Sequence, residues 1–312
     1  MKRILIVYDE PGWIFERHAK EIQKRLTEYH IDLVDHRKNI SEMSADYDVI
    51  YVMDPMPMFY PRTDKTIMGL RCEFLIKEHP EGARGLYEKG FPGRCVAIKP
   101  NCCMLHVVNR NQFSVLKDIV TDKPLLLAQH GIDEEVFDRS KYKKAQNECL
   151  VVGVVGRNSN NKNFDLIKDA CMIAGKNQLV ENKVGFFQAQ YGNRRVPKEK
   201  MPQFYCNIDV LCCASLTEGL SNPIMEAGAM GIPVITTDCG AVREMIKDGV
   251  SGLIVERHTQ ALVDAINKLK DKELRLSMGN KFHEEIMKNW TWKVRIEDFR
   301  KMFGLYFGKE DG

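Results

Sequence analysis

The chain has 312 residues, of which 44% are hydrophobic and 29% are charged. This hydrophobic content supports a sizeable core and excludes a disordered tail, a collagen-like fibre and a small disulfide-stapled scaffold. The 46 basic and 43 acidic residues leave a formal net charge of +3. That balance is too even for a dedicated nucleic-acid binder, so no stable nucleic-acid partner is expected.

The amino terminus and the cysteines favour a cytoplasmic location. The first apolar run, residues 4–7, stops at Tyr8 and Asp9, which is too short for a signal peptide. The ten cysteines include no C-x-x-C pair, and structural thiols in a reducing compartment are the favoured interpretation. No apolar run approaches the roughly 20 residues that a membrane helix needs.

The first half of the chain alternates short apolar stretches with amphipathic ones. This alternation is typical of a parallel sheet with helices on both faces. Strands are predicted at residues 3–8, 31–34, 49–53, 66–70, 95–98, 104–108 and 125–128, and helices at 15–26 and 111–119. The polar, basic stretch 138–148 then predicts a linker between two domains.

A second alternating series follows this stretch. Strands are predicted at residues 149–155, 183–188, 210–214, 233–236 and 253–255, and helices at 164–174, 198–205, 223–230, 242–247, 260–270, 272–288 and 292–306. We therefore expect an α/β fold with two parallel-sheet domains, residues 1–140 and 148–290, facing each other across a cleft. Residues 291–312 are expected to form a terminal helix that returns to the first domain. Ligands of such sheets bind at the carboxyl ends of the strands.

Residues 215–231 form the strongest candidate site, because they leave a buried strand, make a polar turn and enter a helix. Ser221 or Asn222 is expected to cap this helix, and Pro223 suits its first position. The unpaired N–H groups at the start of the helix favour a phosphate, and Gly219 allows the backbone to approach a ligand closely.

Two carboxylates, Glu218 in the turn and Glu226 in the helix, lie eight residues apart. A carboxylate can accept two hydroxyl hydrogen bonds at once, which matches the vicinal diol of a sugar or a ribose. The alternative is an ordinary capped helix with two solvated glutamates.

A second candidate lies where the strand at 149–155 ends. Gly156 is followed by Arg157, a polar loop and Lys162, without the Gly-Lys-Ser/Thr ending of a Walker loop. Two cations at the carboxyl end of a strand could hold a diphosphate, Arg as a fork and Lys as a point charge. A solvated surface loop is the alternative.

Together these segments resemble the retaining nucleotide-sugar glycosyltransferases of the GT-B architecture, which has two Rossmann-like domains, and specifically glycosyltransferase family four. Glu218 and Glu226 match the Glu-x7-Glu signature of that family, and Gly156, Arg157 and Lys162 match its Gly-Arg-x4-Lys loop. Residues 233–244, 249–255 and 130–137 are similar to three further family segments, with Ala241 in place of a glycine. The resemblance runs from about residue 123 to 305.

The resemblance implies a role for each matched residue. Arg157 and Lys162 would hold the donor diphosphate and offset its charge as it leaves, and Glu218 would contact the transferred sugar. Glu226 would bind the ribose. The backbone near Arg195 and Val196 would meet the nucleobase. The remaining donor-binding candidates are Gly12, Gly156, Gly219, Leu220, Ser221 and Asn222.

The amino-terminal half departs from the family pattern. The usual Gly-Gly loop is replaced by residues 9–13, where Gly12 allows close approach and Trp13 either stacks on a sugar or fills the core. The His that usually follows the fourth strand is absent, which leaves Arg71 or Glu73 as its substitute. His106 falls inside a predicted strand, where a structural role is favoured.

The resemblance thus implies a retaining glycosyltransferase that uses a nucleoside-diphosphate sugar, with UDP as the expected nucleotide, without a metal or other cofactor. The acceptor is not defined by the sequence. The open alternatives are a nucleotide-sugar epimerase of the same architecture and a catalytically silent nucleotide-sugar-binding relative. The cations of residues 15–26 also suggest weak, peripheral contact with the inner membrane, against the alternative of a solvated helix face.

Overall fold

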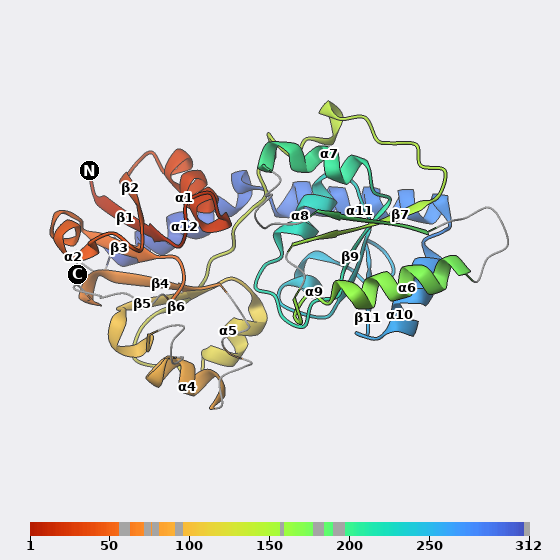
Figure 1. Ribbon diagram of the computed structural model, residues 1–312. Helices are drawn as coiled ribbons and strands as arrows, with labels where there is room; N and C mark the ends of the chain where they lie inside the picture. Colours follow the sequence, from red (N-terminus) through yellow and green to blue (C-terminus); the bar gives the residue numbers. More distant parts are fainter. Residues whose placement is uncertain are drawn as a thin grey trace. The chain divides into compact units, whose positions relative to one another are not determined.

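The computed structural model describes residues 1–55, 63–71, 76, 81–90, 96–156, 159–176, 184–189 and 197–308. The chain forms two compact units, one of Met1–His130 with the segment from Arg295 onward, and one of Gly131–Val294 (Figure 1). The polar stretch after residue 138 belongs to the second unit. Its Ala145 N–H donates to the Cys206 carbonyl at 2.9 Å, and Asn147 donates to Asp209 at 3.0 Å.

The first unit is built on a six-stranded, fully parallel sheet of order β2-β1-β3-β4-β5-β6. Its strands are β1 (Arg3–Tyr8), β2 (His30–Asp35), β3 (Val49–Val52), β4 (Thr66–Leu70), β5 (Met104–Val107) and β6 (Leu125–Leu127). Its helices are α1 (Ile14–Arg25), α2 (Ile40–Met43), α4 (Gly82–Lys89), α5 (Arg110–Leu116) and, from Arg295, α12 (Trp292–Phe307), with short 3-10 turns at Ser44–Asp46, Thr63–Lys65 and Lys99–Asn101.

Both faces of this sheet are covered, since β3, β4 and β5 are buried at every position rather than at alternate ones. Leu5 and Val7 of β1 belong to the core that includes residues of α4 and α5. On the other face, Tyr51 of β3 contacts Phe299 and Phe303 of α12, with ring centroids 6.3 and 5.9 Å apart. The terminal helix therefore packs in the first unit, as expected.

The predicted strand at 95–98 is wrong for the residues described, since 96–98 lie outside any strand and lead into the 3-10 turn. Residues 96 and 97 are partly exposed there, whereas Ile98 is fully buried. Helix α4 was not among the predicted elements. The other six strands of this unit are found within a residue or two of their predicted positions.

The second unit holds a five-stranded parallel sheet of order β11-β10-β9-β7-β8. The strands are β7 (Leu150–Val155), β8 (Val184–Ala189), β9 (Val210–Cys213), β10 (Val234–Thr237) and β11 (Leu253–Val255). The helices are α6 (Phe164–Lys176), α7 (Met201–Cys206), α8 (Asn222–Ala229), α9 (Val242–Met245), α10 (Thr259–Lys268) and α11 (Lys272–Asn289), with 3-10 turns at Arg139–Lys141 and Lys198–Lys200.

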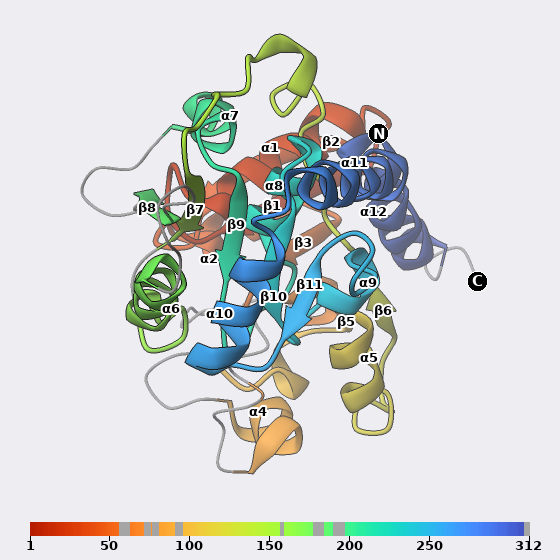
Figure 2. The same cartoon turned by 90° about the vertical axis from the view of Figure 1, so that its right-hand side faces the viewer.

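Helices cover both faces of the second sheet, with α6 and α10 on one face and α7, α8 and α11 on the other (Figures 1 and 2). Helix α8 approaches α11 closely because Gly228 has no side chain. A Cβ atom at Gly228 would lie 2.5 Å from Ile286 and 2.8 Å from Phe282 of α11. This contact packs the carboxyl-terminal part of α8 against α11.

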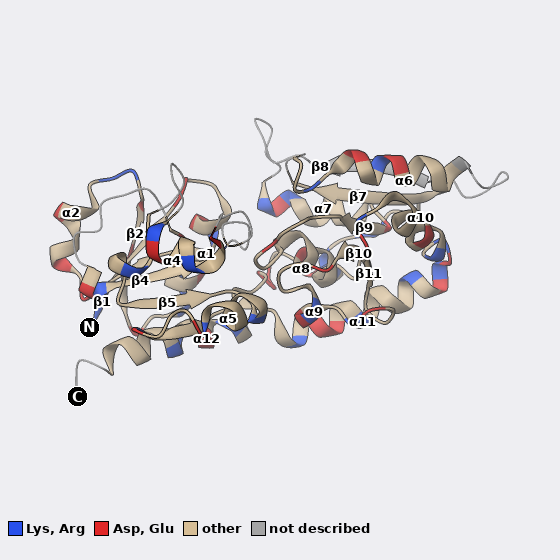
Figure 3. Ribbon diagram, turned by 90° about the horizontal axis from the view of Figure 1, so that it is seen from below, with Lys and Arg blue, Asp and Glu red and all other residues tan. Residues whose placement is uncertain are grey.

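Charged residues lie mainly on helices and loops, whereas the strands are largely uncharged (Figure 3). On α1, Lys20 pairs with Glu16 at 2.7 Å, and Arg25 pairs with Glu21. These i,i+4 pairs make α1 a mixed-charge surface rather than the purely basic face that an anionic membrane attracts. None of the described helices is long and apolar enough to cross a bilayer.

Candidate donor site in the second unit

Lys162 and Glu218 form a close ion pair at the carboxyl ends of β7 and β9. Lys162 Nζ lies 2.5 Å from Glu218 Oε1, and the side chains are 19% and 16% exposed. Burial lowers the pKa of Lys162, but attraction to the Glu218 carboxylate outweighs it, so the pKa lies above its ordinary value. Lys162 is therefore a fixed positive charge at the edge of the sheet.

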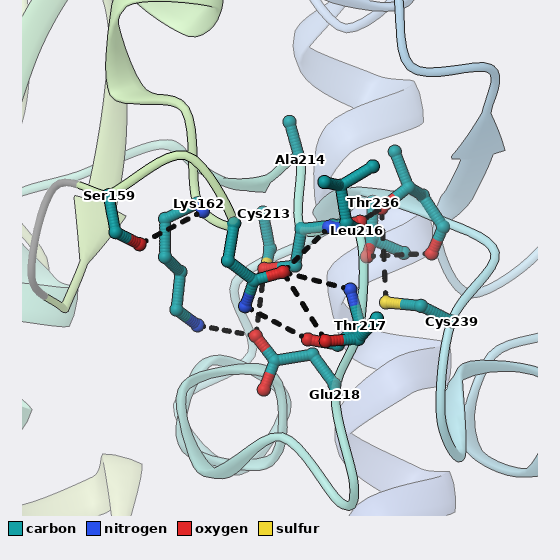
Figure 4. Close-up of polar contacts among 12 residues, drawn as sticks. Ser159, Lys162, Cys213, Ala214, Leu216, Thr217, Glu218, Thr236 and Cys239 are labelled. Atoms are coloured by element: carbon teal, nitrogen blue, oxygen red, sulfur yellow. Dashed lines mark hydrogen bonds and ion pairs between the residues drawn. The ribbon is translucent and has the colours of Figure 1, made fainter. Parts of the chain in front are cut away.

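Figure 4 shows the side chain of Lys162 directed toward Glu218. The side chain of Asn161 holds the loop that carries Glu218. The Asn161 Oδ1 atom accepts the backbone N–H groups of Leu216 at 3.1 Å and Thr217 at 3.0 Å, while its Nδ2 donates to the Thr217 carbonyl at 3.1 Å. One amide side chain thus joins the loop after β7 to the loop after β9. These bonds hold the loops of Lys162 and Glu218 beside each other.

Two further residues fix the Glu218 carboxylate through hydrogen bonds. Ser215 Oγ donates to Glu218 Oε1 at 2.7 Å, and Thr237 Oγ1 donates to the Ser215 carbonyl at 2.5 Å. Gly240 passes so close to the loop that a Cβ atom there would lie 2.4 Å from the Gly219 carbonyl oxygen. Its φ of +56° also favours glycine.

Helix α8 begins directly after this loop, with Ser221 as its N-cap residue and Pro223 in the second helical position. The Ser221 side chain does not cap the helix. Its Oγ atom is buried and has no hydrogen-bond partner in the part of the chain that the structure describes. A buried hydroxyl at the start of a helix is a donor that suits an anion, because the helix dipole favours negative charge there.

Glu226 lies one turn into α8 and is 4% exposed, so it is not the solvated glutamate of the alternative interpretation. The Tyr205 hydroxyl donates to Glu226 Oε2 at 2.8 Å, and Tyr205 itself is fully buried in α7. A tyrosine from another helix therefore fixes the orientation of this carboxylate.

Near the start of the second unit, Asp133 forms a second, partly buried ion pair with Lys198 in the 3-10 turn before α7. Lys198 Nζ lies 2.5 Å from Asp133 Oδ2, and Asp133 also accepts the Glu135 and Val136 N–H groups. Burial raises the pKa of Asp133, but these bonds outweigh it, so the pKa lies below its ordinary value. The pair anchors the chain that leads into the Tyr205 helix.

The structure brings together Lys162, Glu218 and the backbone of Gly219, with Leu220, Ser221, Asn222 and Glu226 continuing into α8. Gly156 ends β7 with a φ of +123°, and a Cβ atom there would touch Lys162 at 3.4 Å. Arg157, Arg195, Val196 and Glu73 lie outside the described residues. Gly12 belongs to the first unit, where its N–H donates to Glu16 at 2.5 Å.

Sequence reasoning missed the residues that hold the site: Asn161, Ser215, Tyr205 and Arg257. Arg257 donates to the carbonyls of Ala214 at 2.8 Å and Asn160 at 2.7 Å, which joins the same two loops. The available signal was positional, since Asn161 and Ser215 each flank a motif residue. No group of three or more His, Cys, Asp or Glu side chains among the described residues could hold a metal.

Comparison with known proteins relates the chain to glycosyltransferases. Residues 170–272, about a third of the chain, match the family described as glycosyl transferases group 1. The chain is 27% identical over 210 residues to the capsular polysaccharide biosynthesis glycosyltransferase CapM of Staphylococcus aureus, which covers 59% of this chain and 55% of CapM. It is 30% identical over 128 residues to D-inositol 3-phosphate glycosyltransferase of Corynebacterium jeikeium, 40% of this chain and 30% of that protein.

Solved structures share the fold along the whole chain. Sucrose-phosphate synthase from Thermosynechococcus elongatus matches with a TM-score of 0.73 at 13% identity, covering 99% of this chain and 100% of that one. The Anabaena protein HepE, solved with UDP and glucose, matches with a TM-score of 0.72 at 12% identity, covering 97% and 100%.

The two parallel-sheet units thus have the fold of GT-B glycosyltransferases. The family match within the second unit relates the chain to the group 1 glycosyltransferases of that fold. The chain spans about half the length of the curated relatives it matches.

Proposed function

We propose that the protein is a retaining, metal-independent glycosyltransferase of family four that transfers a sugar from a UDP-sugar to an acceptor. The observation that carries the proposal is the placement of Lys162 and Glu218 beside the start of α8 in the second unit. The names of the relatives support the activity, and the structure of HepE with UDP and glucose supports the nucleotide. The reported relatives are named as glycosyltransferases, which gives the epimerase alternative no support.

The diphosphate of the donor would lie at the start of α8. There the Ser221 hydroxyl supplies a donor, and the helix dipole favours negative charge. Because Ser221 Oγ has no partner within the described residues, a phosphate oxygen would satisfy a donor that is otherwise buried at a cost of about 1–3 kcal/mol.

Lys162 would stabilise the charge that develops on the leaving diphosphate when the bond from the sugar C1 to the phosphate oxygen breaks. Its raised pKa keeps it protonated, as this role requires. Glu218 would accept a hydroxyl hydrogen bond from the transferred sugar, held in place by Ser215. Arg157 is proposed as the second cation on the strength of the family motif.

Glu226 would accept the two ribose hydroxyls, in the orientation that Tyr205 sets. The backbone at Arg195 and Val196 is proposed to contact the nucleobase by resemblance to the family. Retention of configuration and the absence of a metal are likewise proposed from the family rather than from the site geometry.

A single-turnover assay tests the proposal. UDP-α-D-glucose is incubated with the full chain in the presence of EDTA, and the sugar released by slow hydrolysis is followed by NMR. We expect UDP and α-configured glucose as the first products, and no release by the Lys162→Met variant. A β-configured product would refute retention, inhibition by EDTA would refute metal independence, and an intact epimeric UDP-sugar would identify an epimerase. Binding of UDP without any turnover would identify the silent relative.

The nucleotide is tested separately, because the fold accepts several. Ligands that bind only the folded state raise the melting temperature. We expect UDP to raise it more than GDP, ADP or TDP at equal concentration. A larger melting-temperature shift with GDP or ADP would identify that nucleotide, instead of UDP, as the one in the donor. The rest of the proposal would be unaffected.

A further inference from the structure

The first unit gathers polar side chains where its strand order reverses. The chain runs from β1 outward to β2 and then crosses to β3 on the other side of β1, so the crevice between β1 and β3 is a switch point of the sheet. Asp9 follows β1, Asp54 follows β3 and Arg71 follows β4. All three lie at the carboxyl edge, where ligands of parallel sheets bind.

Arg71 is the unusual member of this group, because a charged side chain that is 5% exposed normally pairs fully. Its Nη1 donates to His18 Nδ1 at 2.8 Å, and its guanidinium carbon lies 5.4 Å from the centre of the Phe15 ring. The Nε and Nη2 atoms are buried and form no hydrogen bond of normal geometry with the residues that the structure describes. The Tyr51 hydroxyl lies close enough for the Arg71 charge to oppose the rise in its pKa.

These two atoms form one edge of the guanidinium group. The N–H groups of Nε and Nη2 point in the same direction, and this edge is the fork that binds two oxygens of a carboxylate or phosphate at once. The Nη1 contact to His18 fixes the plane of the group and leaves that edge directed away from His18. The side chain is thus oriented as a bidentate oxyanion donor.

The neighbouring carboxylates do not occupy the edge. Asp54 Oδ1 accepts the backbone N–H of Arg71 at 2.8 Å, and neither Asp54 nor Asp9 forms an ion pair with the guanidinium group. Burial raises the pKa of Asp54 to about 7 and also raises the pKa of Asp9. Both carboxyls therefore hold protons more readily than usual, which reduces the negative charge that an incoming anion would meet.

We propose that the Nε–Nη2 edge of Arg71 binds the oxyanion, a phosphate ester or a carboxylate, of a second molecule at the carboxyl edge of the first sheet. This subsite is formed by residues of the first unit, whereas the proposed diphosphate site is formed by residues of the second unit. Assigning the molecule as the acceptor rests on the proposed function, whereas oxyanion binding by Arg71 does not.

Calorimetric titration of the full chain tests the subsite. The probes are sn-glycerol 3-phosphate with glycerol as its neutral counterpart, and D-glucuronate with D-glucose. The variants are Arg71→Lys, which keeps the charge but loses the fork, and Arg71→Gln. Arg84→Gln is the matched control, because Arg84 is exposed in α4 of the same unit. UDP affinity is measured in every variant.

We expect at least one of the two oxyanions to bind at least tenfold more tightly than its neutral counterpart. The oxyanion with the larger preference shows whether the subsite takes a phosphate ester or a carboxylate. Arg71→Lys and Arg71→Gln should lose that preference, whereas Arg84→Gln should keep it. Oxyanions that bind no better than the neutral probes, or an undiminished preference in Arg71→Lys, would overturn the subsite. An unchanged melting profile in the Arg71 variants shows that both units fold, and absent UDP binding by the parent chain would refute the donor proposal alone.

Discussion

The pairing of Lys162 with Glu218 makes opposite predictions for the two partners. In the free protein the Lys162 ammonium is already held by the Glu218 carboxylate, so a diphosphate must share it. Lys162→Met should weaken UDP binding because a cationic contact to phosphate is lost. Glu218→Gln should leave UDP binding equal or tighter because the competing negative charge is removed, although turnover should fall.

The magnitudes follow from the partial burial of the pair. A charge-assisted hydrogen bond to phosphate contributes about 1.5–3 kcal/mol, whereas a pair as exposed as this one contributes about 1 kcal/mol. Lys162→Met should therefore weaken UDP binding by roughly tenfold to a hundredfold. Glu218→Gln should strengthen it by up to about fivefold.

The assay is calorimetric titration with UDP of the parent, both single variants and the double variant, together with urea unfolding. Lys162→Met should lower the unfolding free energy by about 1–2 kcal/mol because it leaves a half-buried Glu218 without its cation. The double variant should regain that stability without regaining UDP affinity. Lys168→Met, on the exposed face of α6, is the control. Parent-like UDP affinity in Lys162→Met, or equal weakening in both single variants, would refute the reasoning.

Three further predictions follow from single contacts. Gly240→Ala should lower the unfolding free energy by about 2 kcal/mol or more and weaken UDP binding, because its Cβ would meet the Gly219 carbonyl at 2.4 Å. Gly249→Ala, at a φ of +72° with nothing within 4 Å, should cost only about 1 kcal/mol, and equal losses would contradict the steric argument. Tyr205→Phe should weaken UDP binding about fivefold but leave binding of 2′,3′-dideoxy-UDP unchanged, and a loss common to both ligands would indicate a purely structural role. Burial lowers the pKa of His106 to about 3, so the unfolded state takes up a proton first as the pH falls below 6.5. The unfolding free energy of the parent chain should then drop by about 2 kcal/mol between pH 6.5 and 5. In urea titrations, His106→Gln should lack this part of the pH dependence. The same pH dependence in the variant and the parent would contradict the prediction.

Much of the fold could be predicted from the sequence because both sheets are parallel and buried. Strands covered on both faces are apolar at every position, so β1, β7 and β9 stand out as short runs between polar turns. The run at 95–98 has a similar apolar composition, but its described residues, 96–98, lie in a loop. Composition alone does not distinguish an apolar strand from an apolar loop, because the difference lies in whether the segment pairs with neighbouring strands.

The sequence led us to expect that Lys162 and Glu218 lie together, but not which residues hold them in place. Lys162 and Glu218 lie 56 residues apart, and the position of each at the end of a strand was enough to expect them together. The amide of Asn161 and the hydroxyl of Tyr205 act through hydrogen bonds whose partners depend on tertiary packing. The unpaired edge of Arg71 is likewise a property of its surroundings and has no sequence signal.

The central claim is that Lys162, the start of α8 and Glu226 bind one sugar nucleotide. A crystal structure of the full chain with UDP tests it most directly. The account predicts the diphosphate within hydrogen-bond distance of Lys162 Nζ and Ser221 Oγ, and the ribose hydroxyls on the Glu226 carboxylate. UDP bound elsewhere, or bound with Lys162 and Glu226 both out of contact, would contradict it.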